Sequence, residues 1–163
     1  IRDPEGRPVA PGTAGELHVR GEQVAGEYLE QGSRLDPGGW FPTRDAGFLD
    51  ADGFLFLGGR TDDVIVRGGE NLSPGEIEDV LFTHPDVRDA AVVGVPDEQW
   101  GEAVAAAVVL REGRRTSVSE LQQWVKERLR SSRTPERIEF FEELPYNETG
   151  KLLRRVVRER LGT

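Results

Sequence analysis

The chain has 163 residues, of which 36% are hydrophobic and 31% charged, a composition typical of an ordinary globular protein. Its formal net charge of -9 disfavours nucleic-acid binding, which needs a concentrated basic surface. Cysteine is absent, which excludes a disulfide framework, a thiol nucleophile and a thiolate metal site, and no apolar run approaches the roughly 20 residues of a membrane span.

The start of the chain indicates a piece of a longer protein. The sequence contains no methionine and opens on Ile1 within a polar, turn-rich stretch. Nothing at that end resembles a signal peptide, so we expect a cytoplasmic protein.

Residues 1–60 are expected to form short antiparallel strands separated by turns. Residues 16–20 alternate between polar and apolar, and Asp50-Ala51-Asp52-Gly53 separates two aromatic runs. An Asp-Gly turn between such runs is typical of a β-hairpin. The segment is short for an independent domain, so we expect the β-rich end of a larger domain whose other strands precede Ile1.

After Arg60 the pattern changes to helices interleaved with strands. Residues 64–66 predict a brief strand. The segment Ser73-Pro74-Gly75-Glu76 predicts the start of a helix, with serine as N-cap, proline at the first helical position and glutamate completing a capping box. Pro85 is expected to end this helix. Its apolar side comprises Ile77, Val80, Leu81 and His84.

The remainder completes a small domain. Two continuous apolar runs, residues 90–95 and 103–110, predict strands that are buried on at least one face. A second capping box, Ser117 with Glu120, begins another helix, and a strand at 138–141 precedes the last one. The apolar positions of these two helices are Val118, Leu121, Trp124, Val125 and Leu129, then Leu152, Leu153, Val156, Val157 and Leu161. Such a small mixed sheet with flanking helices makes residues 61–163 an α+β domain.

The last helix is locally basic. Its cations are Arg154, Arg155, Arg158 and Arg160. On a terminal helix, we expect them to form a solvated face together with Glu159.

Four separated segments carry a family resemblance. They are Trp40-Phe41-Pro42-Thr43-Arg44-Asp45, residues 59–71, Pro96-Asp97-Glu98-Gln99-Trp100-Gly101-Glu102 and residues 144–155. In this order and spacing they resemble the adenylate-forming (AMP-binding) enzymes, which comprise acyl-CoA synthetases, adenylation domains of peptide synthetases and luciferases. The resemblance covers essentially the whole chain but only the last third or so of such an enzyme.

The resemblance implies chemistry in two steps. A carboxylic acid attacks the α-phosphate of ATP, giving an acyl-adenylate and pyrophosphate, and a thiol of coenzyme A or of an acyl or peptidyl carrier protein then displaces AMP. It also implies Mg²⁺, bound mainly by the missing N-terminal domain, and a small C-terminal domain that swings about a hinge between the steps.

The resemblance implies that two residues contact the nucleotide and that a third is the hinge of the domain rotation. Asp45 resembles the aspartate that accepts hydrogen bonds from the two ribose hydroxyls, although it could also be a turn aspartate. Arg60 resembles an arginine that contacts the nucleotide. Asp62 falls on the hinge position, a role that rests wholly on the resemblance. At Arg44 the family usually has glycine, so the bulky side chain either hinders the backbone's approach to the nucleotide or adds a cation there.

The second group of residues is implied to contact coenzyme A. Gly68 and Gly69 remove Cβ atoms where a backbone approaches a ligand or takes positive φ, and with Glu70 they would line the pantetheine tunnel. The alternative is a tight turn before Ser73. Trp100 matches a position that contacts coenzyme A in some synthetases, while an isolated tryptophan is more often part of a core.

Lys151 is one of only two lysines in the chain. An ammonium is a flexible point charge that can contact oxygens of two different groups, which a planar guanidinium does less well. The resemblance makes it the catalytic lysine of adenylation, which bridges the substrate carboxylate and a ribose oxygen. The alternative is a solvated cation in the first turn of a helix.

Competing functions stay open. The loop Arg67-Gly68-Gly69-Glu70-Asn71-Leu72 favours an acyl-CoA synthetase over a peptide-synthetase adenylation domain, which usually has Ile-Glu there and would load an amino or aryl acid onto a carrier protein. A luciferase-like oxygenase is a third reading. The family's phosphate-binding loop and acyl pocket are not among these residues, so this segment alone is expected to be inactive. As a complete product it would be a non-catalytic module.

Overall fold

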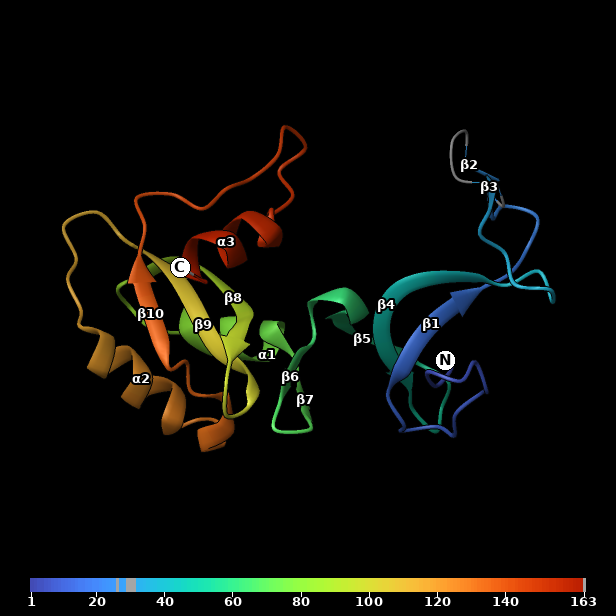
Figure 1. The fold of residues 1–163 in the computed structure, drawn as a ribbon, viewed down its shortest axis with the longest axis horizontal. Helices are drawn as coiled ribbons and strands as arrows, with labels where there is room; N and C mark the ends of the chain where they lie inside the picture. The colour runs from blue at the N-terminus through green and yellow to red at the C-terminus, as the bar shows by residue number, and fades with distance from the viewer. Residues whose placement is uncertain (26, 29–31, 163) are drawn as a thin grey trace. The chain divides into compact units, whose positions relative to one another are not determined.

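The computed structural model describes residues 1–25, 27, 28 and 32–162, and the chain forms two compact units, Ile1–Asp62 and Asp63–Thr163 (Figure 1). Each unit has its own sheet, and each is described by itself below.

The first unit contains an antiparallel sheet with strand order β1-β4-β5. Its strands are β1 (Gly15–Val19), β4 (Phe41–Leu49) and β5 (Leu55–Arg60), and a two-stranded ribbon is formed by β2 (Glu27–Tyr28) and β3 (Gly32–Ser33). The 3-10 helix η1 (Thr61–Asp63) follows β5. The Asp50 carboxylate closes the β4–β5 turn by accepting the N–H groups of Asp52 and Phe54 at 3.0 and 2.8 Å, while Gly53 takes φ +86°. The predicted hairpin is therefore confirmed.

The second unit is built on a five-stranded mixed sheet. Its strand order is β10-β9-β6-β7, with β8 also paired to β9; β10 runs parallel to β9 and the other pairs are antiparallel. The strands are β6 (Ile65–Arg67), β7 (Glu70–Leu72), β8 (Val87–Asp97), β9 (Gly101–Leu110) and β10 (Arg137–Phe140). The helices are α1 (Pro74–Phe82), α2 (Val118–Lys126), α3 (Arg154–Leu161) and the 3-10 helix η2 (Ser131–Arg133). This architecture confirms the predicted α+β class.

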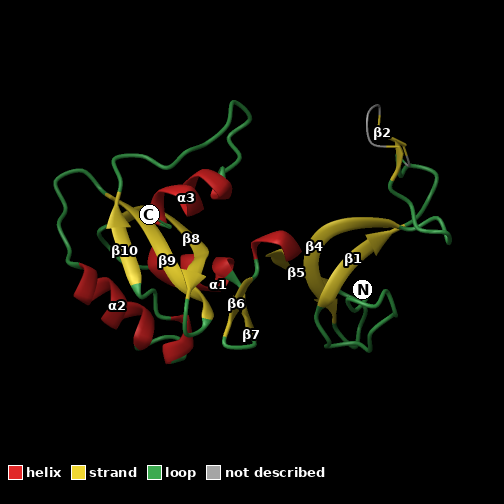
Figure 2. Ribbon diagram, in the orientation of Figure 1, coloured by secondary structure: helices red, strands yellow, loops and turns green. Residues whose placement is uncertain are grey.

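Both faces of the β8–β9 pair are buried, which explains why these strands are continuously apolar. Alternate residues such as Val92 and Val104 pack against α1 and α2, whereas their neighbours Val93 and Ala105 pack against Val157 of α3. Helices therefore cover both faces of the sheet (Figure 2). None of the helices among the described residues is long and apolar enough to span a membrane.

The two predicted helix starts differ in outcome. Ser117 and Glu120 form the expected reciprocal capping box. Ser73 is the N-cap of α1, but its side chain makes no cap hydrogen bond, so the first predicted box is wrong. Glu76 instead accepts a hydrogen bond from Arg133 Nε at 2.7 Å, because an arginine 57 residues later in the chain competes for its carboxylate.

Candidate functional site

Asp45 and Arg60 lie opposite each other in the register of β4 and β5. Arg60 Nη1 lies 3.3 Å from Asp45 Oδ1, and Arg60 Nη2 lies 3.6 Å from Asp62 Oδ2. The Asp45 and Arg60 side chains are each 38% exposed, so both can still reach a ligand. The structure thus brings the predicted nucleotide residues and the predicted hinge residue into one polar cluster.

Arg44 joins this cluster from β4. It has φ +62°, and it is the one non-glycine residue with positive φ among the residues that the structure describes. The backbone is held there because Arg44 N donates to Glu16 Oε1 at 2.9 Å and Thr61 Oγ1 donates to the Arg44 carbonyl at 3.1 Å. Its guanidinium Nη1 lies 3.1 Å from Asp62 Oδ2. A position that favours glycine conformationally therefore adds a second cation to the cluster.

The β6–β7 turn forms a second group with Trp100. Gly68 N donates to the Trp100 carbonyl at 2.8 Å, and a Cβ on Gly68 would lie 2.9 Å from Trp100 Cε3. Gly68 and Gly69 have φ +56° and +82°, and a Cβ on Gly69 would meet no heavy atom within 4 Å. Trp100 is 42% exposed, so a core position is wrong for it. The Arg67 guanidinium carbon lies 4.9 Å from its ring centroid, so a cation–π contact accompanies the partly exposed ring beside the turn.

Glu70 also belongs to this turn, but the protein itself engages its carboxylate. Arg133 Nη1 donates to Glu70 Oε1 at 2.9 Å. A hydrogen bond from Ser132 is the largest influence that lowers the pKa of Glu70; desolvation opposes it, and Arg133 lowers the pKa further. The carboxylate therefore stays ionised and paired, which makes it a support for the turn.

Lys151 lies in a short hairpin that precedes α3. The arms are joined by the Tyr146–Leu152 bridge, and Leu153 N donates to the Pro145 carbonyl at 2.8 Å. Lys151 comes three residues before Arg154, where α3 begins, so a place in the first turn of that helix is wrong. Among the described residues, its ammonium has no hydrogen bond or ion pair, and the side chain is exposed.

Asn147 organises the tip of this hairpin and was not singled out from the sequence. Its Oδ1 accepts the N–H of Thr149, the hydroxyl of Thr149 and the N–H of Lys151 at 3.0, 2.8 and 2.8 Å. Gly150 N donates to the Asn147 carbonyl at 2.9 Å, and Gly150 takes φ +77°. The signal for this turn is an asparagine followed by a glycine three residues later.

The two predicted reactive turns belong to different edges of the second unit. In Figure 1 the segment that leads into α3 lies at the top of this unit, while the β6–β7 turn lies at its lower edge. No hydrogen bond or ion pair between described residues joins Lys151 to the Gly68–Gly69 turn.

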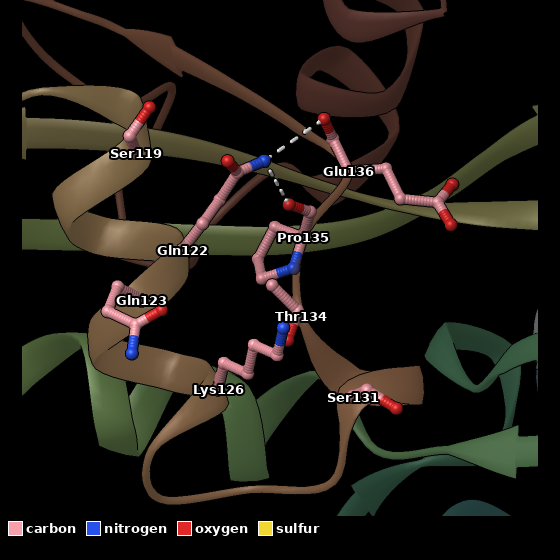
Figure 3. Close-up of a pocket in the computed structure, with 8 residues that line it drawn as sticks. All are labelled: Ser119, Gln122, Gln123, Lys126, Ser131, Thr134, Pro135 and Glu136. Carbon is pink, nitrogen blue, oxygen red and sulfur yellow. Dashed lines mark hydrogen bonds between the residues drawn. The ribbon is translucent and has the colours of Figure 1, made fainter.

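An open polar depression of about 340 Å³ lies between α2 and the segment leading into β10 (Figure 3). Its lining residues are Ser119, Gln122, Gln123, Lys126, Ser131, Thr134, Pro135 and Glu136. None of the predicted site residues contributes to it. The described part of the chain contains no group of three or more histidine, cysteine, aspartate or glutamate side chains placed to hold a metal ion.

Comparisons with known proteins identify the family of this chain. Residues 76–151 match the model of the AMP-binding enzyme C-terminal domain. The 2-succinylbenzoate–CoA ligase of Geobacillus kaustophilus is 44% identical over 94% of this chain and 32% of its own length. The fatty acid–[acyl-carrier-protein] ligase ScoC of Streptomyces coeruleorubidus is 42% identical over 98% of this chain and 31% of its own.

A solved structure is similar in fold as well as in sequence. The o-succinylbenzoate CoA synthetase MenE from Bacillus subtilis, in complex with the acyl-adenylate intermediate OSB-AMP, superposes with a TM-score of 0.89 and 36% identity, over 96% of this chain and 33% of that one. The chain thus spans about a third of the length of the relatives it matches. The chain belongs to the adenylate-forming (AMP-binding) enzyme superfamily, of which it carries the C-terminal domain.

Proposed function

We propose that this chain is the C-terminal part of an ATP-dependent acyl-CoA synthetase, which activates a carboxylic acid as its acyl-adenylate and transfers the acyl group to coenzyme A. The observation that carries the proposal is the unpaired, exposed ammonium of Lys151 at the tip of a hairpin organised by Asn147. Lys151 is one of two lysines in an arginine-rich chain, and its ammonium forms no ion pair with any residue that the structure describes.

In the first step Lys151 would bind the incoming carboxylate and a ribose oxygen. The carboxylate oxygen forms a bond to the α-phosphorus of ATP while the bond to pyrophosphate breaks. A fixed cation between the reactants holds them in line and offsets the negative charge that accumulates at phosphorus. Asp45 would accept hydrogen bonds from both ribose hydroxyls. Arg60 forms an ion pair with Asp45 and would contact the nucleotide from the same cluster.

In the second step the thiol of coenzyme A forms the thioester and AMP leaves. The Gly68–Gly69 turn, with Glu70 held by Arg133, would border the pantetheine arm, and Trp100 would flank it. A turn with little side-chain bulk lets a narrow, extended ligand approach the backbone closely. Residues 1–60 would belong to the large domain, and residues 61–163 would rotate about Asp62 as the small one. The rotation would remove Lys151 from the active site and bring the Gly68–Gly69 turn to it.

Transfer to a carrier protein is the second candidate function. It is supported by ScoC, whose name gives an acyl-carrier-protein as acceptor. The pantetheine arm is common to both acceptors, so the Gly68–Gly69 turn suits either.

Both functions are tested with the intact protein that contains this chain. Pyrophosphate exchange against a panel of carboxylic acids identifies the acid, and coenzyme A consumption or carrier acylation then identifies the acceptor. We expect exchange with at least one acid and consumption of coenzyme A with that acid. Absence of exchange across aliphatic, aromatic and amino acids would contradict the enzyme proposal.

A further inference from the structure

Arg154, three residues after Lys151, forms a buried ion pair with Glu78 of α1. Its Nη2 lies 2.8 Å from Glu78 Oε2, and its Nη1 contacts Glu78 Oε1, so the pair is bidentate. Glu78 is only 7% exposed. Desolvation would lower the pKa of Arg154, but hydrogen bonds and charge from Glu78 outweigh it and the pKa is raised. This finding corrects the expectation that Arg154 belongs to a solvated face, whereas Arg155 is exposed as expected and pairs with Glu159 at 3.2 Å.

The same pair also binds the outer edge of β8. Val92 N donates to Glu78 Oε1 at 2.7 Å, and Arg154 Nη1 donates to the Val92 carbonyl at 2.9 Å. Both backbone groups of Val92 are therefore satisfied by side chains on the side away from β9. A guanidinium can do this because it offers several N–H donors in a fixed plane, whereas an ammonium is a single point of attachment.

A third contact connects Arg154 to the start of the second unit. Arg154 Nε lies 3.3 Å from Asp63 Oδ2. Asp63 is the first residue of that unit and follows Asp62, the proposed hinge. One guanidinium thus joins α1, β8 and the residue next to the hinge.

The other arm of the Lys151 hairpin is fixed to the same strand. Tyr146 donates its hydroxyl to Asp89 Oδ2 of β8 at 2.9 Å. Desolvation by burial, together with the hydrogen bond to Asp89, raises the pKa of Tyr146, so the phenol remains a donor. Both stems of the hairpin are therefore held on β8, one through Tyr146 and the other through Arg154.

We propose that Arg154 is a positioning residue for Lys151: through Glu78, Val92 and Asp63 it makes the hairpin and the residue after the hinge parts of one rigid body. When the second unit rotates at Asp62, the Lys151 hairpin then keeps its position relative to the rest of that unit. This inference rests on the proposed function, since it requires that Lys151 acts in adenylation and that Asp62 is the hinge.

The experiment compares three variants of the intact protein. Arg154→Lys keeps the charge opposite Glu78 but cannot hold three partners together. Asp63→Asn leaves the Arg154–Glu78 pair in place and weakens only the contact beside the hinge. Arg155→Lys is the matched control, because this neighbouring side chain is 85% exposed and pairs only with Glu159 in the described structure.

We expect Arg154→Lys to lower kcat for pyrophosphate exchange by at least about tenfold, because displacements near 1 Å at a reacting group cost up to about a hundredfold. The KM for ATP and the rate of thioester formation from supplied acyl-adenylate should stay within about twofold of the wild type. Amide hydrogen exchange should rise in residues 147–152 but not in β9. Asp63→Asn should also lower kcat for pyrophosphate exchange, by a smaller factor than Arg154→Lys. Arg155→Lys should match the wild type in both measurements.

Different failures have different meanings. Equal loss in both half-reactions, with a lowered melting temperature, would show a merely structural Arg154 and overturn the inference. A wild-type rate of pyrophosphate exchange in Arg154→Lys, together with an impaired Lys151→Ala, would overturn the inference while leaving the proposed function intact. If Arg154→Lys does not fold, Asp63→Asn is the deciding variant, and a wild-type rate of pyrophosphate exchange in it would overturn the inference. An unimpaired Lys151→Ala would instead overturn the proposed function.

Discussion

Asn147 and Lys151 are hydrogen-bonded to each other twice. Lys151 N donates to Asn147 Oδ1 at 2.8 Å, and Asn147 N donates to the Lys151 carbonyl at 2.9 Å. This reciprocal contact fixes the backbone of the lysine while leaving its ammonium in solvent. The charge is therefore placed by the turn, and the side chain keeps the freedom to bind a ligand.

Replacing Lys151 with alanine should slow adenylation by about 10² to 10³, the loss typical of one transition-state donor. Thioester formation from supplied acyl-adenylate should be much less affected, because the other face of the domain would then be in use. Pyrophosphate exchange and single-turnover acyl transfer measure the two steps. Lys126→Ala, which changes the other lysine, is the control, and comparable loss in both steps would argue against two faces.

Replacing Asn147 with alanine removes three hydrogen bonds from the turn without touching the ammonium. Each is worth about 1 kcal/mol in typical proteins, but the turn is exposed and water can replace part of them. We therefore expect a melting temperature close to that of the wild type and about tenfold slower adenylation. Asn147→Asp, which keeps the acceptor, should recover most of the activity; if it does not, the turn is not what positions Lys151.

The two glycines of the β6–β7 turn should differ when substituted. Gly68→Ala should displace Trp100, because the new Cβ would lie 2.9 Å from its ring, and should alter tryptophan fluorescence. Gly69→Ala meets open space and should cost only the strain of positive φ, about 1 kcal/mol. A bulkier residue at Gly69 should slow acyl transfer and spare pyrophosphate exchange. The reverse result would mean that the faces are assigned wrongly.

Arg44 should respond to substitution according to backbone conformation. Arg44→Gly removes an exposed ion pair to Asp62, worth up to about 1 kcal/mol, but relieves the strain of φ +62°. Arg44→Ala loses the same pair and keeps the strain. Denaturant unfolding should therefore show the glycine variant more stable than the alanine variant by about 1 kcal/mol. Equal stabilities would mean that the strain at this position is negligible.

Acid should weaken the capping box of α2. The backbone N–H of Ser117 is the main cause that lowers the pKa of Glu120 from its ordinary value of 4.5. Because the pKa is lower in the folded state, the ionised carboxyl stabilises the fold at pH values above its ordinary pKa. This stabilisation is lost as the pH falls through the lowered pKa of the folded state. Glu120→Gln should flatten the loss of stability below about pH 4.5, measured by thermal unfolding. Glu112→Gln, at an exposed loop position, should follow the wild-type profile.

The strands could be predicted because their burial dictates their composition. Residues 90–95 and 103–110 are apolar because both faces of β8 and β9 are covered, and the structure extends the pair to Asp97 and Gly101, which are opposite each other in register. Strand β7 was not predicted, because Glu70-Asn71-Leu72 is three residues long and its pattern is no different from that of a turn.

Long-range ion pairs could not be predicted. Glu76 has the spacing of a capping box, and Arg154 has the spacing of an exposed basic face, yet both bind partners far along the chain. Local spacing carries no information on which distant carboxylate or guanidinium reaches the same place once the sheet forms. The glycines at the tips of turns were predictable because glycine reports local backbone conformation directly; Asn147 carries a similar signal but was not singled out.

The Glu78–Arg154 pair has a consequence for the behaviour of the domain in solution. An uncovered strand edge is a template on which another polypeptide can add a strand, and repeated addition leads to aggregation. At Val92 that template is already occupied, because side chains from α1 and α3 take the place of a neighbouring strand. This edge of β8 is therefore closed to strand addition at Val92.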